Sequence, residues 1–227
     1  MIANGSFFKK EECRVCESKY LKKAVELTPT PPGNNFLNKE ELNQKEQVYP
    51  LSLDFCVSCS HVQLSHVVDP SFLFQNNYSY VSSTSAVFVE HLKEYADHVT
   101  KMFGLGNSSF VIDIGSNDGT CLSFFKKKSI NVLGIDPATS IANKATKEGI
   151  RTIPDFFNKD VAMQIIEADG KADLITSHNA CAHIDDLSGV IEGVEMLLKD
   201  EGVFVMEVGY FLDVFQNKWF DTIYHEH

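Results

Sequence analysis

The pattern of hydrophobic and polar positions changes near residue 109. Beyond it, short apolar runs alternate with longer amphipathic stretches, and the runs lie at residues 110–114, 131–136, 150–153, 172–177 and 202–207. Such runs predict buried strands, while the stretches between them carry apolar residues at helical spacing. Strands that alternate with helices in this way predict a five-stranded parallel sheet with helices on both faces.

The first 108 residues are less periodic. Residues 86–103 place apolar side chains at helical spacing and predict an amphipathic helix, and residues 72–85 are predicted to be a connector. Before these, residues 49–55 alternate as a short strand does. A region with so little periodicity needs another source of stability, and a bound metal ion is the obvious candidate.

Composition narrows the class of protein. With 227 residues, 44% of them hydrophobic, the chain can form one large domain or two small ones. Twenty Lys and Arg against 31 Asp and Glu give a net charge of −11, which argues against a general nucleic-acid binder. No apolar run reaches the roughly 20 residues that span a bilayer, and the first ten residues lack a signal core. We therefore expect a cytoplasmic protein.

Four of the six cysteines form two Cys-x-x-Cys pairs, Cys13 with Cys16 and Cys56 with Cys59. Each pair can hold two thiolates about 2.3 Å from one ion, and two pairs complete a tetrahedron, so the spacing predicts a closed structural zinc site. His61 could replace one ligand, although its spacing is poorer. Buried free cysteines and a thioredoxin-like redox pair are the alternatives, but redox pairs normally occupy strand-to-helix turns.

The strand at residues 110–114 ends in a glycine turn. Gly115 lets the chain turn sharply and approach a ligand closely, and the helix beyond it presents free N–H groups. Asp136 ends the next strand, where a carboxylate can accept hydrogen bonds from both hydroxyls of a ribose. A dinucleotide site wants a second glycine where this chain has Asn117, so S-adenosylmethionine, which has no pyrophosphate, is the leading candidate. A structural turn beside a solvated Asp136 is the alternative.

Several segments, in this order, resemble the sugar C-methyltransferase family, whose members methylate a ring carbon of nucleotide-linked 4-keto-deoxysugars. The segments are residues 113–119, residues 134–138, Asn179 with residues 182–184, and the terminal Tyr-His-Glu-His at residues 224–227, which we call the tail. The cysteine pairs and residues 49–53 and 77–83 resemble the family's zinc-binding domain and its link to the cofactor domain.

The resemblance implies an α/β fold, in which a class I methyltransferase Rossmann-like parallel sheet is preceded by a small zinc-binding domain. Its boundaries would be residues 1–75 for the zinc-binding domain, 76–108 for a linker and helix, and 109–227 for the S-adenosylmethionine-binding domain. Because family members continue past the tail, this last domain is expected to be incomplete at its C-terminus, with an unpaired sheet edge.

The chemistry that the resemblance implies is methyl transfer to carbon. A base removes the proton beside the keto group, and a base of near-neutral pKa contributes about 10²–10⁴ in rate, which favours histidine. By resemblance, His227 is the general base, Tyr224 and Glu226 orient base or substrate, and His183 contacts the keto or enolate oxygen. An extended tail would place His225 and His227 on one face. A polar, solvated chain end is the alternative.

The remaining predictions concern binding. The resemblance and the glycine turn together predict contacts to S-adenosylmethionine from Gly115, Ser116, Asn117, Asp136, Pro137, Phe156 and Asn179. Substrate contacts are predicted from Tyr78, Tyr80 and His225. Phe156 is equally well explained as core, and the two tyrosines as packing between domains. His178 is expected to be a neighbour with its hydrogen bonds satisfied.

The sequence therefore predicts an S-adenosylmethionine-dependent C-methyltransferase with a structural zinc ion. The alternative is a non-catalytic module that binds S-adenosylmethionine and zinc and acts through a partner chain. The expected partners are a nucleotide-sugar and a missing C-terminal domain or partner chain, with no nucleic acid and no membrane.

Overall fold

The computed structural model describes residues 6–34, 36–76 and 78–226. These residues form two compact units, each described by itself. The smaller unit contains the described parts of residues 6–79, 182–188 and 209–226, and the larger contains residues 80–181 and 189–208. Every helix within the described residues is too short or too polar to span a bilayer.

The larger unit contains the predicted parallel sheet. Its strands are β6 (Phe110–Ile114), β7 (Asn131–Ile135), β8 (Thr152–Ile153), β9 (Ala172–His178) and β10 (Leu198–Glu207). They lie in the order β10-β9-β6-β7-β8, and every neighbouring pair is parallel. The chain first adds strands on one side of β6 and then on the other. The order therefore reverses between β6 and β9, and open parallel sheets bind ligands at the carboxyl ends of the strands at such a point.

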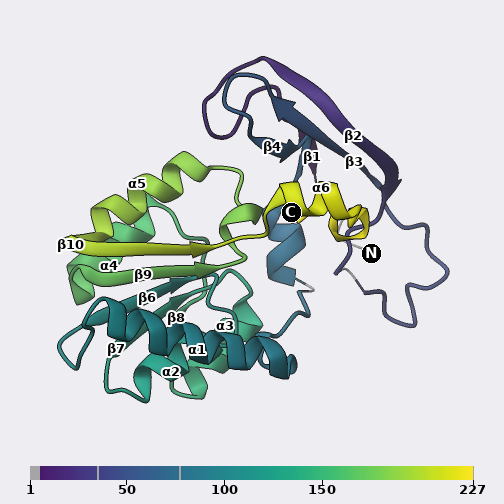
Figure 1. Cartoon of the computed structure of the whole chain (residues 1–227). Helices are drawn as coiled ribbons and strands as arrows, with labels where there is room; N and C mark the ends of the chain where they lie inside the picture. The colour runs from purple at the N-terminus through teal and green to yellow at the C-terminus, as the bar shows by residue number, and fades with distance from the viewer. Residues whose placement is uncertain (1–5, 35, 77, 227) are drawn as a thin grey trace. The chain divides into compact units, whose positions relative to one another are not determined.

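Helices cover both faces of this sheet, as predicted. Helices α1 (Ala86–Met102) and α2 (Thr120–Lys126) lie on one face, and α4 (Lys159–Asp169) and α5 (Leu187–Leu197) lie on the other (Figure 1). Helix α3 (Thr139–Lys147) connects β7 to β8. Helix α1 begins after Ser85, whose hydroxyl accepts a hydrogen bond from the Phe88 N–H and so satisfies one free donor of the first turn.

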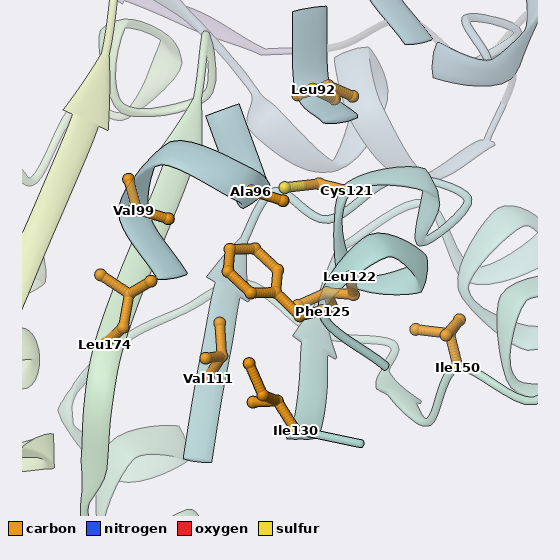
Figure 2. Close-up of a cluster of buried hydrophobic side chains, with 10 residues drawn as sticks. All are labelled: Leu92, Ala96, Val99, Val111, Cys121, Leu122, Phe125, Ile130, Ile150 and Leu174. Carbon is orange, nitrogen blue, oxygen red and sulfur yellow. The ribbon is translucent and has the colours of Figure 1, made fainter. Parts of the chain in front are cut away.

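The main core lies between α1, α2 and the sheet. Leu92, Ala96 and Val99 are the buried residues of α1, and their spacing is that of one helical face. Phe125 of α2 has no exposed surface, and its ring lies among these helices and strands (Figure 2). Burying a side chain of this size contributes about 1.5–3 kcal/mol. The other members of the cluster are Val111, Cys121, Leu122, Ile130, Ile150 and Leu174.

The smaller unit is built from short antiparallel strands. A three-stranded sheet has the order β2 (Leu21–Thr30), β3 (Tyr49–Cys56), β4 (Val62–Leu64), and β1 (Phe7–Lys9) pairs with β5 (His66–Val68). Strand β3 confirms the prediction at residues 49–55. Strand β2 was not predicted, because most of its side chains are exposed and its alternation of apolar residues is weak.

Short helical segments complete the described chain. They are η1 (Phe72–Asn76), η2 (Ser82–Thr84), η3 (Cys181–His183), α6 (Phe211–Asn217) and η4 (Phe220–Thr222). The predicted connector at residues 72–85 thus contains two helical turns.

Candidate functional site

The four predicted zinc ligands lie together in the smaller unit. The Sγ atoms of Cys13 and Cys59 are 3.6 Å apart, those of Cys16 and Cys56 are also 3.6 Å apart, and all four lie within 4.8 Å of one another. Four sulfurs placed about 2.3 Å from a central zinc ion would be separated by about 3.8 Å. The observed spacing fits a tetrahedral zinc site with four cysteine ligands.

The two Cys-x-x-Cys pairs fold in the same way. The N–H of Glu17 donates to the carbonyl of Cys13 over 2.9 Å, and the N–H of Ser60 donates to the carbonyl of Cys56 over 2.8 Å. Glu17 and Ser60, each just after the second cysteine of a pair, have positive φ angles of 58° and 65°. Both turns therefore direct two sulfurs to one point.

The sequence left His61 open as a substitute ligand. Among the described residues, the ligand cluster consists of the four cysteines alone. The carbonyl of His61 instead accepts the N–H of Cys56 over 2.8 Å, which fixes the turn between β3 and β4. Burial raises the pKa of the Cys56 thiol, but hydrogen bonds from the backbone N–H groups of Cys59 and Ser58 and from neighbouring cysteine side chains together lower it to about 6, while the pKa values of Cys16 and Cys59 are raised.

The predicted glycine turn follows β6 in the larger unit. Gly115 and Gly119 have φ angles of 75° and 77°, and Asn117 between them has a φ of 49°. A Cβ on Gly115 would lie 2.3 Å from the Cβ of Ala180, which follows β9. Glycine is thus required here because the loops after β6 and β9 approach each other closely.

The Asn117 side chain holds a neighbouring segment over the turn. Its Oδ1 accepts the N–H of Ser82 over 2.9 Å, and its Nδ2 donates to the carbonyl of Tyr80 over 3.0 Å. The backbone N–H of Asn117 donates to Asp136 over 2.8 Å. Asn117 therefore does more than occupy the place of a glycine in the turn, because it also orders residues 80–82.

Asp136 lies at the end of β7, as predicted, but it is not solvated. Only 5% of its surface is exposed, and its second carboxylate oxygen accepts the N–H of Ala138 over 2.9 Å. Burial raises the pKa of Asp136 to about 6, against the lowering effect of its two N–H donors. Each carboxylate oxygen keeps a lone pair for a further donor such as a ribose hydroxyl. Pro137 follows it directly.

A small cavity with both polar and apolar walls lies where the strand order reverses. Its volume is about 20 Å³, and its walls include Asp113, Gly115, Ser116 and His178. Asp113 Oδ1, Ser116 Oγ and both ring nitrogens of His178 are buried without a hydrogen-bond partner among the described residues. His178 was expected to have its hydrogen bonds satisfied, and its polar neighbour among the described residues is Asp113, 3.8 Å away. A buried polar group without a partner is costly, so the cavity suits one water-sized hydrogen-bonding group.

Asp113 and His178 were not predicted to take part in binding. Neither pattern nor spacing could pair them, because they lie on β6 and β9 and meet only when the sheet forms, with Asp113 Oδ1 and His178 Nδ1 3.8 Å apart. The buried carboxylate of Asp113 has its pKa raised by desolvation. The position of Asp113 just before the glycine turn was the one signal available.

Two further predicted cofactor residues border the larger unit's sheet. Asn179 follows β9 with a φ of 53°, and its backbone N–H donates to the carbonyl of Glu207 at the end of β10 over 2.8 Å. Phe156 is half-buried, while its neighbour Phe157 is buried and packs against Gly193 of α5. Of this pair, Phe157 therefore belongs to the core and Phe156 keeps an exposed face.

The described part of the tail lies in the smaller unit, where Tyr224 is half-buried and the next two residues are buried. His225 and Glu226 have 6% and 4% of their surface exposed, so the alternative of a solvated chain end does not hold for them. Both residues are in a turn, so the alternation expected of an extended segment does not apply. His183 Nδ1 contacts the backbone carbonyl of Glu226. The predicted base, His227, lies outside the described residues.

Burial sets the protonation of the tail. It raises the pKa of Tyr224, with a further contribution from the charge of Glu226, so the phenol stays protonated near neutral pH. It also raises the pKa of Glu226 and lowers the pKa of His225. The His225 Nε2 lies 3.2 Å from the Tyr49 carbonyl, which suits a neutral ring that donates this hydrogen bond.

The predicted substrate residues Tyr78 and Tyr80 belong to different units. Tyr78 packs edge-on against Phe74 at 5.7 Å between ring centroids, and Phe74 also packs against His183 at 6.0 Å. Tyr80 belongs to the larger unit and keeps 43% of its surface exposed, while its carbonyl is held by Asn117. Tyr78 is therefore the tyrosine that shares an aromatic neighbour with a predicted acid–base residue.

Comparison with known proteins agrees with this division of sites. Residues 13–74 match a family described as a zinc binding domain, and residues 88–227 match a family described as a methyltransferase domain. C-methyltransferase NovU from Streptomyces niveus is 35% identical over 217 residues, which make up 96% of this chain and 51% of NovU. The chain thus spans about half the length of this curated relative.

Solved structures that resemble this chain include two proteins of similar coverage. The PH0226 protein from Pyrococcus horikoshii OT3 has 16% identity and a TM-score of 0.47, covering 61% of this chain and 62% of its own. The plantazolicin methyltransferase BpumL, in complex with a pentazolic desmethylPZN analog and SAH, has 15% identity and a TM-score of 0.47, covering 60% and 51%.

The comparisons and the geometry bear out the broad predictions from the sequence. The family resemblance, the class of fold, the methyltransferase class, and zinc with S-adenosylmethionine as cofactors are confirmed. The roles of individual site residues and the boundaries at residues 75 and 108 stay predictions.

Proposed function

The chain belongs to the methyltransferase family, and from this premise we propose that it transfers the methyl group of S-adenosylmethionine to a ring carbon of a nucleotide-activated 4-keto-deoxysugar. NovU, the curated relative, is named a C-methyltransferase. We include a cytoplasmic location in the proposal, because a zinc site built from four cysteines needs reduced thiols.

One observation carries the proposal beyond methyl transfer in general. His183 and the tail are 43 residues apart in the sequence, and His183 Nδ1 contacts the carbonyl of Glu226. The fold of the smaller unit thus gathers the residues whose chemistry suits proton transfer. Carbon methylation needs such a group, because the carbon beside a ketone becomes nucleophilic only after it loses a proton.

The proposed roles combine the family resemblance, which assigns His227, with the protonation and burial of the described residues. His227 removes the proton beside the keto group. The Tyr224 phenol, kept protonated by its raised pKa, donates a hydrogen bond to the oxygen on which negative charge develops. Glu226 orients the imidazole of His227 and stabilises its cationic form, as buried carboxylates do for catalytic histidines. His183 contacts the keto oxygen, and Tyr78 with Tyr80 and His225 bind the substrate.

The larger unit has groups that fit S-adenosylmethionine. When bound, this cofactor supplies an electrophilic methyl group on a sulfonium. Asp113, Ser116 and His178 present unpartnered polar atoms to a cavity of about 20 Å³, which fits the ammonium group of the methionine part. The carboxylate of Asp136 accepts hydrogen bonds from the ribose hydroxyls. The other proposed contacts come from Gly115, Asn117, Pro137, Phe156 and Asn179.

Deuterium wash-out tests the proposed function. In D₂O without S-adenosylmethionine, the chain should exchange the hydrogen beside the keto group of a nucleotide-linked 4-keto-deoxysugar. The His227→Asn variant should lose this exchange by about 10²-fold or more, since a positioned base supplies about 10²–10⁴ in rate. The His98→Asn variant, which changes an exposed histidine of α1, should exchange normally.

Exchange at the wild-type rate in His227→Asn would contradict the assigned base. Tight binding of S-adenosylmethionine with no exchange and no methyl transfer to any keto-sugar would favour the alternative, a non-catalytic module that acts through a partner chain.

A further inference from the structure

The tail contacts one end of the β2–β3 pair with three consecutive residues. Thr30 at the end of β2 pairs with Tyr49 at the start of β3, so this end includes the loop that follows β2. His225 Nε2 lies 3.2 Å from the Tyr49 carbonyl, the Asn34 side chain donates to Glu226, and a Cβ at Gly33 would lie 3.6 Å from the Tyr224 ring. The opposite end of the same pair leads to the zinc ligands, since Leu21 pairs with Cys56.

The contact between Asn34 and Glu226 is the closest of the three. The Asn34 Nδ2 lies 2.9 Å from Oε1 and 3.0 Å from Oε2 of Glu226, although the residues are 192 positions apart. One amide nitrogen therefore spans both carboxylate oxygens. Pro31 and Pro32 precede this loop and restrict its backbone, and Pro32 is buried, so Asn34 is presented by a stiff segment.

A neutral amide fixes the direction of a carboxylate without adding charge. Lysine or arginine at this place would hold Glu226 ionised and strongly lower its pKa. Asn34 lowers the pKa of Glu226 too, but burial outweighs it and the pKa stays above its ordinary value. The carboxyl group is thus held in a fixed orientation and remains basic enough to stabilise a neighbouring imidazolium.

The groups that face Glu226 support this arrangement. Tyr224 has its pKa raised in part by the charge of Glu226, and His183 contacts the Glu226 carbonyl. Among the described residues, Glu226 forms no salt bridge with a lysine or arginine. Asn34 is therefore the side chain that orients this buried carboxyl group.

We propose that Asn34, delivered by the zinc-binding unit, is a positioning residue that orients Glu226 for proton abstraction. This inference rests on the proposed function. It gives the zinc-binding unit a second task besides its own stability, because the strand pair stabilised by zinc at one end supports the acid–base tail at the other.

The kinetic test uses the 227-residue chain with Asn34→Ala, Asn34→Asp and Asn34→Gln. Loss of orientation should lower kcat for deuterium exchange about 10–100-fold in Asn34→Ala, with KM changed less than about threefold, and Asn34→Gln should recover part of the rate. In Asn34→Asp two carboxyl groups face each other, and each raises the pKa of the other. The acidic limb of the pH profile of the exchange rate should therefore move up by about one pH unit or more. Asn38→Ala, in the same loop, is the matched control and should behave as wild type.

A second measurement is independent of activity. A ¹³C NMR titration of the Glu226 carboxyl, assigned by Glu226→Gln, should show a higher pKa in Asn34→Ala than in wild type, and no change in Asn38→Ala. Zinc content and the thermal midpoint identify any variant that fails to fold. An unchanged titration, or an Asn34→Asp protein with the wild-type rate and pH profile, would overturn the inference. If the titration shifts but wild type exchanges no keto-sugar proton, the proposed function fails and the assignment of Asn34 to Glu226 stands.

Discussion

Asp136 combines burial with two backbone donors, and this sets opposite pH dependences for folding and for binding. Its pKa of about 6 lies above the ordinary value of 3.8, so the folded chain favours the protonated form. Stability from this group is present below pH 4 and is lost as the pH rises to about 6, by about 3 kcal/mol at most. Ribose hydroxyls prefer the ionised carboxylate, so cofactor binding should strengthen over the same range.

We therefore expect the affinity of wild type for S-adenosylmethionine to rise about tenfold from pH 5 to pH 7, because only about a tenth of Asp136 is ionised at pH 5. Asp136→Asn should bind more weakly at pH 7 and show little pH dependence. Asp155→Asn, which changes an exposed carboxyl after β8, is the control. Calorimetric titration at both pH values checks this, and a wild-type affinity that is flat or falls with pH would contradict it.

Single residues also show where sequence reasoning ends. The sequence predicted Gly115 as a turn that approaches a ligand, yet the group closest to it is Ala180, 2.3 Å from where its Cβ would be. The sequence could predict that glycine is needed here but not that Ala180 lies beside it, because the loops after β6 and β9 meet only once the sheet has formed. The same holds for Asp113 with His178 and for Asn34 with Glu226, which are distant in sequence.

At the scale of elements, predictability followed burial. Strands β6, β7 and β9 are buried along most of their length, and their apolar runs predicted them nearly to the residue. Strand β2 is mostly exposed and was missed, although it is ten residues long. The zinc ligands were predictable despite this, because coordination geometry fixes the Cys-x-x-Cys spacing whatever the surrounding strands do.

The zinc site should be essential to the β2–β3 pair. Replacing Cys56 by serine removes one of four ligands at the end of β3. The described part of the smaller unit has two small apolar clusters to compensate, one around Leu51, Leu53 and Ile223 and one around Tyr49, Val68 and Leu73. We expect Cys56→Ser to lose its zinc and several degrees of thermal stability, since structural zinc contributes directly to folding. Cys121→Ser, a buried cysteine of the main core, should keep one zinc ion per chain. Elemental analysis and thermal unfolding check both, and full zinc in Cys56→Ser would exclude the four-cysteine site.

At the scale of the whole molecule, the two units supply different parts of the proposed reaction. The smaller unit holds the described tail residues with His183, and the larger holds Asp136 and the cavity at β6 and β9. In the proposed reaction, proton abstraction would depend on the first set and methyl donation on the second. Variants in the two units should therefore separate the two steps.

We expect Glu226→Gln to lower both deuterium exchange and methyl transfer about 10–100-fold, because the base acts before the methyl group moves. Asp136→Asn should weaken methyl transfer at limiting S-adenosylmethionine by about tenfold, while exchange measured without the cofactor stays within about twofold of wild type. The two rates are compared on the same preparations, with deuterium exchange followed by NMR and methyl transfer followed by mass spectrometry. If Asp136→Asn lost exchange as severely as transfer, with zinc content and unfolding midpoint unchanged, the division of the reaction between the two units would be wrong.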